Sequence, residues 1–297
     1  MNEYQNHPLA GATDLDSAFN KLWYFYKKYF IGLYIISVVS ALLTSLITSS
    51  IDLSSFQAVT DDPEAAFELM KSWAGPYALM MLVSLLFVVI LHAWVLERPA
   101  GEPGFVASIL KKTLVALVPY LVAMVILTVI MTMLVSVGIV LLVLPGLFAL
   151  FYMATVIMFA MPVTLVETRN PFEVIGRSFR LAHKNLWPNM GWVVVVLLII
   201  VIASMLLSAV VMLPFTGTFM RSFADPDQAA SLLDMHRNPL FIGLNALTSA
   251  LVTPLMPLLA FLLYFRNRSE EVVAEITTDN DGAVRVEDLY PPVEDNN

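Results

Sequence analysis

The run VVVVLLIIVIASMLLSAVVML, residues Val193–Leu213, decides the fold class of this chain. As a helix it is long enough to cross a hydrocarbon core of about 30 Å, which takes about 20 residues. It shows no alternation of apolar and polar residues, whereas the strands of a membrane barrel alternate strictly. The run therefore predicts a membrane-spanning helix.

The composition of the rest of the chain supports the same class. Of the 297 residues 59% are hydrophobic and 13% are charged, and the mean hydropathy is +0.78. A soluble domain has about 25% charged residues. Residues 1–28 are polar, so we expect no cleavable signal peptide, and the first spanning helix serves as the insertion signal. The chain has no cysteine, which excludes disulfides and thiolate chemistry.

Six apolar runs predict six spanning helices, and the fold is therefore an all-α polytopic membrane protein. Two prolines, Pro145 and Pro239, suit the first turn of a helix, where a missing N–H costs nothing. The predicted spans are 29–49, 74–96, 113–137, 145–166, 191–213 and 240–265. We expect three parts: a cytoplasmic segment 1–28 with an amphipathic helix, a six-helix membrane domain 29–268, and an acidic, disordered cytoplasmic tail 269–297.

The distribution of lysine and arginine predicts the orientation, because short cytoplasmic connections are enriched in both. On one side of the membrane the connections carry only Lys71, Arg221 and Arg237. On the side expected to be cytoplasmic they carry Lys21, Lys27, Lys28, Arg98, Lys111, Lys112, Arg169, Arg177, Arg180, Lys184, Arg266, Arg268 and Arg285. We therefore expect both termini in the cytoplasm of a bacterium, with the chain in its inner membrane. The net charge of −8 lies in the tail, which carries nine acidic residues and one arginine.

Two short segments on the outer side begin with an Asp-Pro pair, which favours a helix start. The pattern predicts one outer helix from Asp62 to Trp73 and another from Asp225 to His236. Both carry apolar residues at helical spacing. We expect them to lie against the outer membrane interface.

The stretch NPFEVIGRSFRLAHKNLW, residues Asn170–Trp187, predicts an amphipathic helix on the cytoplasmic side. Asn170 suits the cap, Pro171 the first position, and Glu173 the positive end of the helix dipole. One face carries Glu173, Arg177, Arg180 and Lys184, and another Phe172, Ile175, Phe179, Ala182 and Leu186. Similar basic, amphipathic stretches precede the first and third spanning helices.

Basic helices of this kind can lie in the plane of the lipid headgroups. The candidate residues for contact with anionic headgroups are Arg177, Arg180, Lys184, Lys21, Lys27, Lys28, Lys111 and Lys112. The alternative interpretation is that they only fix the topology, which the orientation rule already requires. At the end of the fourth span Glu167 is expected to form an ion pair with Arg169, Arg177 or Arg180.

No pattern of catalytic residues is present. The chain lacks the GxSxG, HExxH, Walker and GxGxxG motifs, and its four histidines are scattered over both sides. We expect no enzyme activity, no metal site, no cofactor and no nucleic-acid partner.

The stretch Leu141–Trp187 resembles the YciC-like bacterial inner-membrane proteins. It is also similar to the membrane domain that precedes some glycerophosphodiester phosphodiesterases. The residues that carry the resemblance are Pro145-Gly146, Pro162-Val163, Glu167 and Arg177-Ser178. The catalytic barrel of those phosphodiesterases has no counterpart here. The resemblance implies an inner-membrane protein connected with envelope lipids.

Three hypotheses of function remain open. The first is a non-enzymatic inner-membrane protein whose basic interfacial helices contact anionic lipids and whose acidic tail recruits a protein partner. The second is a transporter or a lipid-translocating channel lined by the proline-containing helices. The third is a membrane subunit or assembly factor of a larger complex.

Overall fold

The computed structural model describes residues 7–12, 14–51, 63–100, 105–224 and 234–281. Within these ranges 92% of the residues are helical and none lies in a strand. Six helices are long and apolar enough to cross a membrane. The chain is a multi-pass, all-α membrane protein, and the fold class predicted from the sequence is confirmed.

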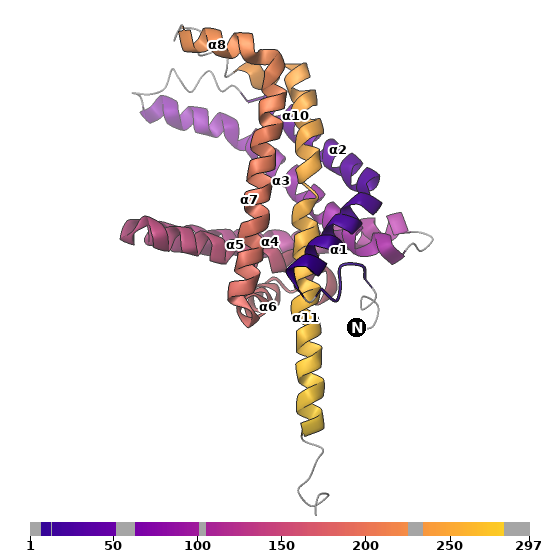
Figure 1. Cartoon of the computed structure of the whole chain (residues 1–297). Helices are drawn as coiled ribbons and strands as arrows, with labels where there is room; N and C mark the ends of the chain where they lie inside the picture. The colour runs from indigo at the N-terminus through magenta and orange to yellow at the C-terminus, as the bar shows by residue number, and fades with distance from the viewer. Residues whose placement is uncertain (1–6, 13, 52–62, 101–104, 225–233, 282–297) are drawn as a thin grey trace, which may run out of the picture.

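The helices follow one another with short connections (Figure 1). In chain order they are α1 (Leu15–Lys28), α2 (Phe30–Ser49), α3 (Pro63–Glu97), η3 (Arg98–Ala100), α4 (Phe105–Leu141), α5 (Val143–Val166), α6 (Pro171–Lys184), α7 (Leu186–Met212), η4 (Leu213–Phe215), α8 (Thr216–Ala224), η6 (Asp234–Arg237), α10 (Pro239–Val252) and α11 (Leu255–Asp281).

The core is built around α11. Its run Leu258–Phe265 is buried on all sides, as expected for a helix that is apolar all round. Around it pack Val89–Leu96 at the end of α3, the second half of α5, the inner face of α6, and α1. We call the end of the molecule where these segments meet the basic end, because it carries most of the lysine and arginine. In Figure 1, α6 lies beside the end of α7 opposite α8, and α11 continues past it.

The N-terminal residues pack into this core. His7, Leu9 and Ala12 are buried, and Nε2 of His7 lies 3.1 Å from the carbonyl oxygen of Val95 in α3. The His7 ring contacts the rings of Phe25 in α1 and Phe265 in α11. The segment therefore joins three helices that are far apart in the sequence.

Most of the remaining helical surface is apolar and exposed. The α4–α5 hairpin extends sideways from α7 and α11 in Figure 1, and Val140 and Leu144 near its tip are 85% and 77% exposed. Gly138 and Gly146 allow close approach of the two helices, because a Cβ on either would overlap the other helix. In water such a surface would be unfavourable by about 25 cal/mol per Å². Lipid chains are the environment that removes this penalty.

Besides the earlier starts of α4 at Phe105 and of α7 at Leu186, the structure differs from the sequence-based boundaries in three places. The outer helix predicted for Asp62–Trp73 is the first part of α3, which passes Pro76 without a break, whereas residues 225–233 lie outside the described residues. The last span breaks at Thr253 and Pro254, and the hydroxyl of Tyr26 donates to the carbonyl of Leu251 beside this break, at 2.8 Å.

The third difference concerns the tail. α11 continues to Asp281, so residues 269–281 are helical. The sequence had predicted these residues as the start of a disordered tail. Contacts from Glu270 and Glu271 to α6 and the residues next to it hold the first turn of this extension. Residues 282–297 lie outside the described residues.

Candidate functional site

The start of α6 forms as the sequence predicts. The side chain of Asn170 accepts a hydrogen bond from the backbone N–H of Phe172 at 3.1 Å, and Pro171 occupies the first turn. The carboxylate of Glu173 accepts hydrogen bonds from the Thr168 hydroxyl and the Asn170 amide. These bonds use neutral donors, so they fix the carboxylate without neutralising its charge.

The buried face of α6 overlaps only in part with the predicted apolar stripe, of which Ala182 is fully buried and Ile175 and Phe179 pack against the core. Val174, Ser178 and Leu181 are fully buried, whereas Phe172 is 73% exposed. The hydroxyl of Ser178 donates to the carbonyl of Val174 at 2.7 Å, and this bond allows a serine in an apolar contact. The aromatic residue instead faces outward, as side chains of this type do at a membrane interface.

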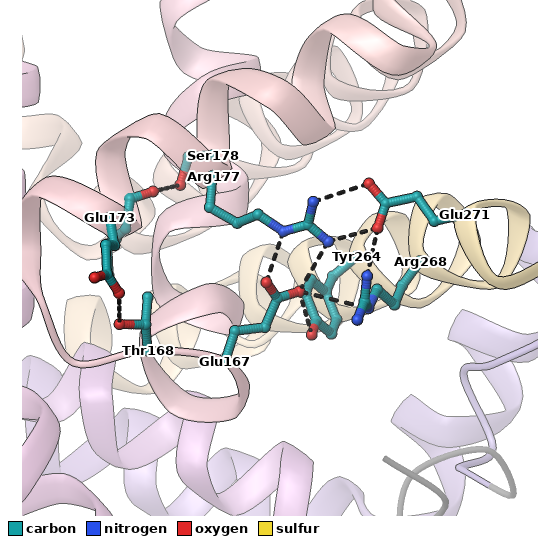
Figure 2. Close-up of polar contacts among 9 residues, drawn as sticks. Glu167, Thr168, Glu173, Arg177, Ser178, Tyr264, Arg268 and Glu271 are labelled. Atoms are coloured by element: carbon teal, nitrogen blue, oxygen red, sulfur yellow. Dashed lines mark hydrogen bonds and ion pairs between the residues drawn. The ribbon is translucent and has the colours of Figure 1, made fainter. Parts of the chain in front are cut away.

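Arg177 leaves α6 toward α11 and ends between two carboxylates (Figure 2). Its Nε donates to Glu167 at 2.6 Å, and its Nη1 donates to Glu271 at 2.9 Å. The side chains of Arg177, Glu167 and Glu271 are 15%, 18% and 16% exposed. Of the three ion-pair partners predicted for Glu167, it is Arg177 that forms the pair.

Two residues of α11 complete this ion-pair network. Arg268 donates to Glu271 at 2.6 Å and lies 3.7 Å from Glu167. The hydroxyl of Tyr264 donates to Glu167 at 2.9 Å. The network therefore joins the end of α5, the middle of α6 and the extension of α11. Figure 2 shows Glu173 outside it, directed toward Thr168.

The electrostatics of Arg177 follow from these contacts. Burial by itself would lower the pKa of the guanidinium. The hydrogen bonds and charges of Glu271 and Glu167 outweigh burial and raise the pKa above its ordinary value. Arg177 is therefore a structural cation whose guanidinium is paired with one carboxylate on each side.

A second polar cluster lies beside the network. The side-chain amides of Asn189 in α7 and Asn267 in α11 bond reciprocally, at 2.9 Å and 3.2 Å, and both residues are fully buried. The amide of Asn185 donates to Asn267 and to Glu270. This cluster fixes the turn between α6 and α7 against α11.

A cleft opens on the outer side of α6. Its volume is about 340 Å³, and we call it the α6 cleft. It is lined by Glu167, Thr168, Glu173, Gly176, Arg177 and Arg180. Two carboxylates and two guanidinium groups thus surround one opening.

The other predicted lipid-contact residues divide into two groups. Lys21 donates to the carbonyl of Ala10, and Lys112 pairs with Glu97. Lys184 is exposed, with Nζ 3.5 Å from the carbonyl of Asn267. The remaining predicted contacts, which are also exposed, are Lys27, Lys28, Lys111 and Arg180. Arg169, predicted as an ion-pair partner of Glu167, is exposed as well.

Sequence reasoning missed four residues of the site: Tyr264, Asn267, Arg268 and Glu271. They lie at helical spacing, with Tyr264 near the end of the apolar run of the last span and the other three just beyond it. This spacing was the available signal. It was overlooked because the helix was expected to end at the first charged residues.

Among the described parts of the chain, no group of three histidine or acidic side chains is placed to hold a metal ion. Comparison with protein-family models, with curated proteins and with solved structures finds no match to this chain.

Proposed function

We propose that this chain is a non-enzymatic protein of a bacterial inner membrane, with both termini in the cytoplasm. Its basic end lies at the cytoplasmic surface and holds anionic lipid headgroups through α1 and α6. We also propose that the chain belongs to the YciC-like family. Two of the residues that carry the resemblance, Glu167 and Arg177, pair directly.

The observation that carries this proposal is the pairing of exposed cations with exposed aromatic rings on α1. Lys27 Nζ lies 5.5 Å from the ring centre of Trp23, which is 46% exposed. Lys28 Nζ lies 5.6 Å from the ring centre of Tyr24, which is 57% exposed. Aromatic rings of this kind settle at the boundary between acyl chains and headgroups, and the cations then reach the phosphates.

A similar arrangement supports a role for α6. Phe172 at its start is 73% exposed, and Trp187, just beyond its end, is 68% exposed. Arg180 and Lys184 are exposed between them. Aromatic anchors at the start of α6 and just beyond its end would hold it in the interface, and its cations would face the headgroups.

The contacts within the protein narrow the predicted set. Arg177, Lys21 and Lys112 are engaged by internal oxygens, so they contribute less to a lipid surface. The proposed contacts are Lys27, Lys28, Lys111, Arg180 and Lys184. Each basic residue near an anionic leaflet contributes about 1 kcal/mol, so the five together form a substantial attraction.

The test is lipid analysis of the purified full-length protein by native mass spectrometry. A variant with Lys27→Gln, Lys28→Gln, Arg180→Gln and Lys184→Gln is expected to lose most of its co-purifying phosphatidylglycerol and cardiolipin. The matched control is Lys71→Gln, an exposed lysine of the first part of α3, far from the basic end. Equal retention of anionic lipid by the wild type and the fourfold variant would refute the proposal.

A further inference from the structure

The α6 cleft contains one cation and one anion that form no ion pair with any side chain that the structure describes. Arg177 and Glu167 are saturated by each other and by α11. Arg180 has no hydrogen bond or ion pair with any residue that the structure describes. Glu173 accepts hydrogen bonds only from neutral groups in that part of the chain. A bound anion would satisfy Arg180 and a bound cation would satisfy Glu173.

The positions of the two groups suit a single ligand with both charges. Glu173 and Arg180 are seven residues apart on one helix, which places them two turns, or about 10.5 Å, apart along its axis. Gly176 lies between them on the same face, and all three residues line the cleft. A group lying over Gly176 is therefore within reach of both ends.

Gly176 has no explanation within the fold. A Cβ added there would meet nothing within 4 Å, so no close helix packing requires a glycine. Alanine would favour the helix by about 1 kcal/mol. Gly75, Gly191, Gly217 and Gly243 are equally open, and Gly176 lies in the α6 cleft between the charged side chains of Glu173 and Arg180. A missing side chain at this place keeps the floor of the cleft free for a ligand.

We propose that the α6 cleft binds a phosphoethanolamine group, with its phosphate on Arg180 and its primary ammonium on Glu173. Guanidinium groups bind phosphate with charge-assisted hydrogen bonds, and a carboxylate accepts such bonds from an ammonium. A choline group has no N–H to donate and is recognised by aromatic rings, which the lining of the cleft lacks. The source is the headgroup of phosphatidylethanolamine, since exposed Phe172 beside the cleft lies at headgroup depth in the function proposed above, on which this step rests.

The experiment uses the full-length protein in detergent, titrated with phosphatidylethanolamine, phosphatidylcholine and phosphatidylglycerol of identical acyl chains. Bound lipid is counted by native mass spectrometry. A fourth arm adds soluble glycerophosphoethanolamine as a competitor. The variants are Glu173→Gln, Arg180→Gln and Gly176→Leu, and the controls are Arg169→Gln outside the cleft and Gly75→Leu at an equally open glycine.

The wild type is expected to bind phosphatidylethanolamine about tenfold more tightly than phosphatidylcholine, from one charge-assisted bond. Glu173→Gln should remove this preference, Arg180→Gln and Gly176→Leu should weaken the binding of both lipids, and the two controls should change neither. Competition by the soluble compound would show that the headgroup alone carries the recognition, and no competition would show that the acyl chains are needed too; both results keep the assignment of the group.

Two results would overturn the inference. One is a wild type without preference for phosphatidylethanolamine. The other is a preference that survives Glu173→Gln. Failure of the proposed function is distinguishable: Lys27→Gln with Lys28→Gln would then leave phosphatidylglycerol retention unchanged, whatever the cleft variants do to phosphatidylethanolamine.

Discussion

The ion-pair network around Arg177 gives the sharpest prediction, namely that Arg177 stabilises the fold while Arg180, three residues away, does not. Substitution Arg177→Gln leaves Glu167 and Glu271 with Arg268 as their remaining cation. Removing one partner of a fully buried pair costs about 3–5 kcal/mol, and surface pairs are worth about 0–1 kcal/mol. With side chains 15–18% exposed, the network lies between these limits, and we expect a loss of about 2 kcal/mol.

The assay is unfolding of the purified protein by increasing SDS in a mild detergent, followed by circular dichroism. A double-mutant cycle with Arg177→Gln and Glu271→Gln should give a coupling energy of about 1–2 kcal/mol, because the two side chains are in direct contact. Arg180→Gln is the matched control and should change stability by less than about 0.5 kcal/mol. If Arg177→Gln is no more destabilising than Arg180→Gln, the network does not hold α6 to α11.

Three further outcomes can be measured in the same way. Burial lowers the pKa of His7 to about 4, although the hydrogen bond to the carbonyl of Val95 acts in the opposite direction. The free energy of unfolding should therefore be constant above about pH 6.5 and fall by about 3 kcal/mol as the pH drops to 4, and His7→Phe should remove this dependence. Gly32→Ala should destabilise the contact of α2 with α3, because its Cβ would overlap the ring of Trp94, whereas Gly75→Ala should be neutral or stabilising by circular dichroism. Asn189→Ala should cost about 1–3 kcal/mol in the SDS titration, since it leaves the buried amide of Asn267 with fewer partners, and an unchanged midpoint would contradict this.

The sequence predicted the elements whose signals are local. Six spans follow from the length of apolar runs, and the start of α6 follows from Asn170 and Pro171, because capping depends on adjacent residues only. The start of α10 at Asn238 and Pro239 is confirmed for the same reason. Boundaries were wrong where a neighbouring segment decides them. The predicted outer helix ending at Trp73 is continuous with the second span in α3. Charged residues did not end α11, because their partners lie on α6 and beside it.

The side-chain geometry of the site was less predictable, because helical periodicity gives the face of a residue but not its partner. Arg177 and Arg180 share one stripe in the sequence, yet one enters the core and the other remains exposed. The difference arises from Glu271, which is 94 residues away from Arg177 along the chain. Ser178 likewise made the buried face of α6 hard to predict. A serine counts as polar in the sequence pattern, but its hydroxyl is satisfied here by the carbonyl of Val174.

The burial pattern explains how one wall of the α6 cleft is held in place. The core of α11, the end of α3 and the N-terminal residues all meet at the basic end, and the ion-pair network fastens α6 to them. A site gains affinity when its groups are held in place before the ligand arrives. Because Arg177 is fixed by two carboxylates, it positions the wall of the cleft and leaves Arg180 as the cation available for binding. Loss of the network should therefore weaken phosphatidylethanolamine binding in Arg177→Gln, even though Arg177 itself contacts no ligand in this arrangement, and unaltered binding in that variant would show that the cleft does not depend on the network.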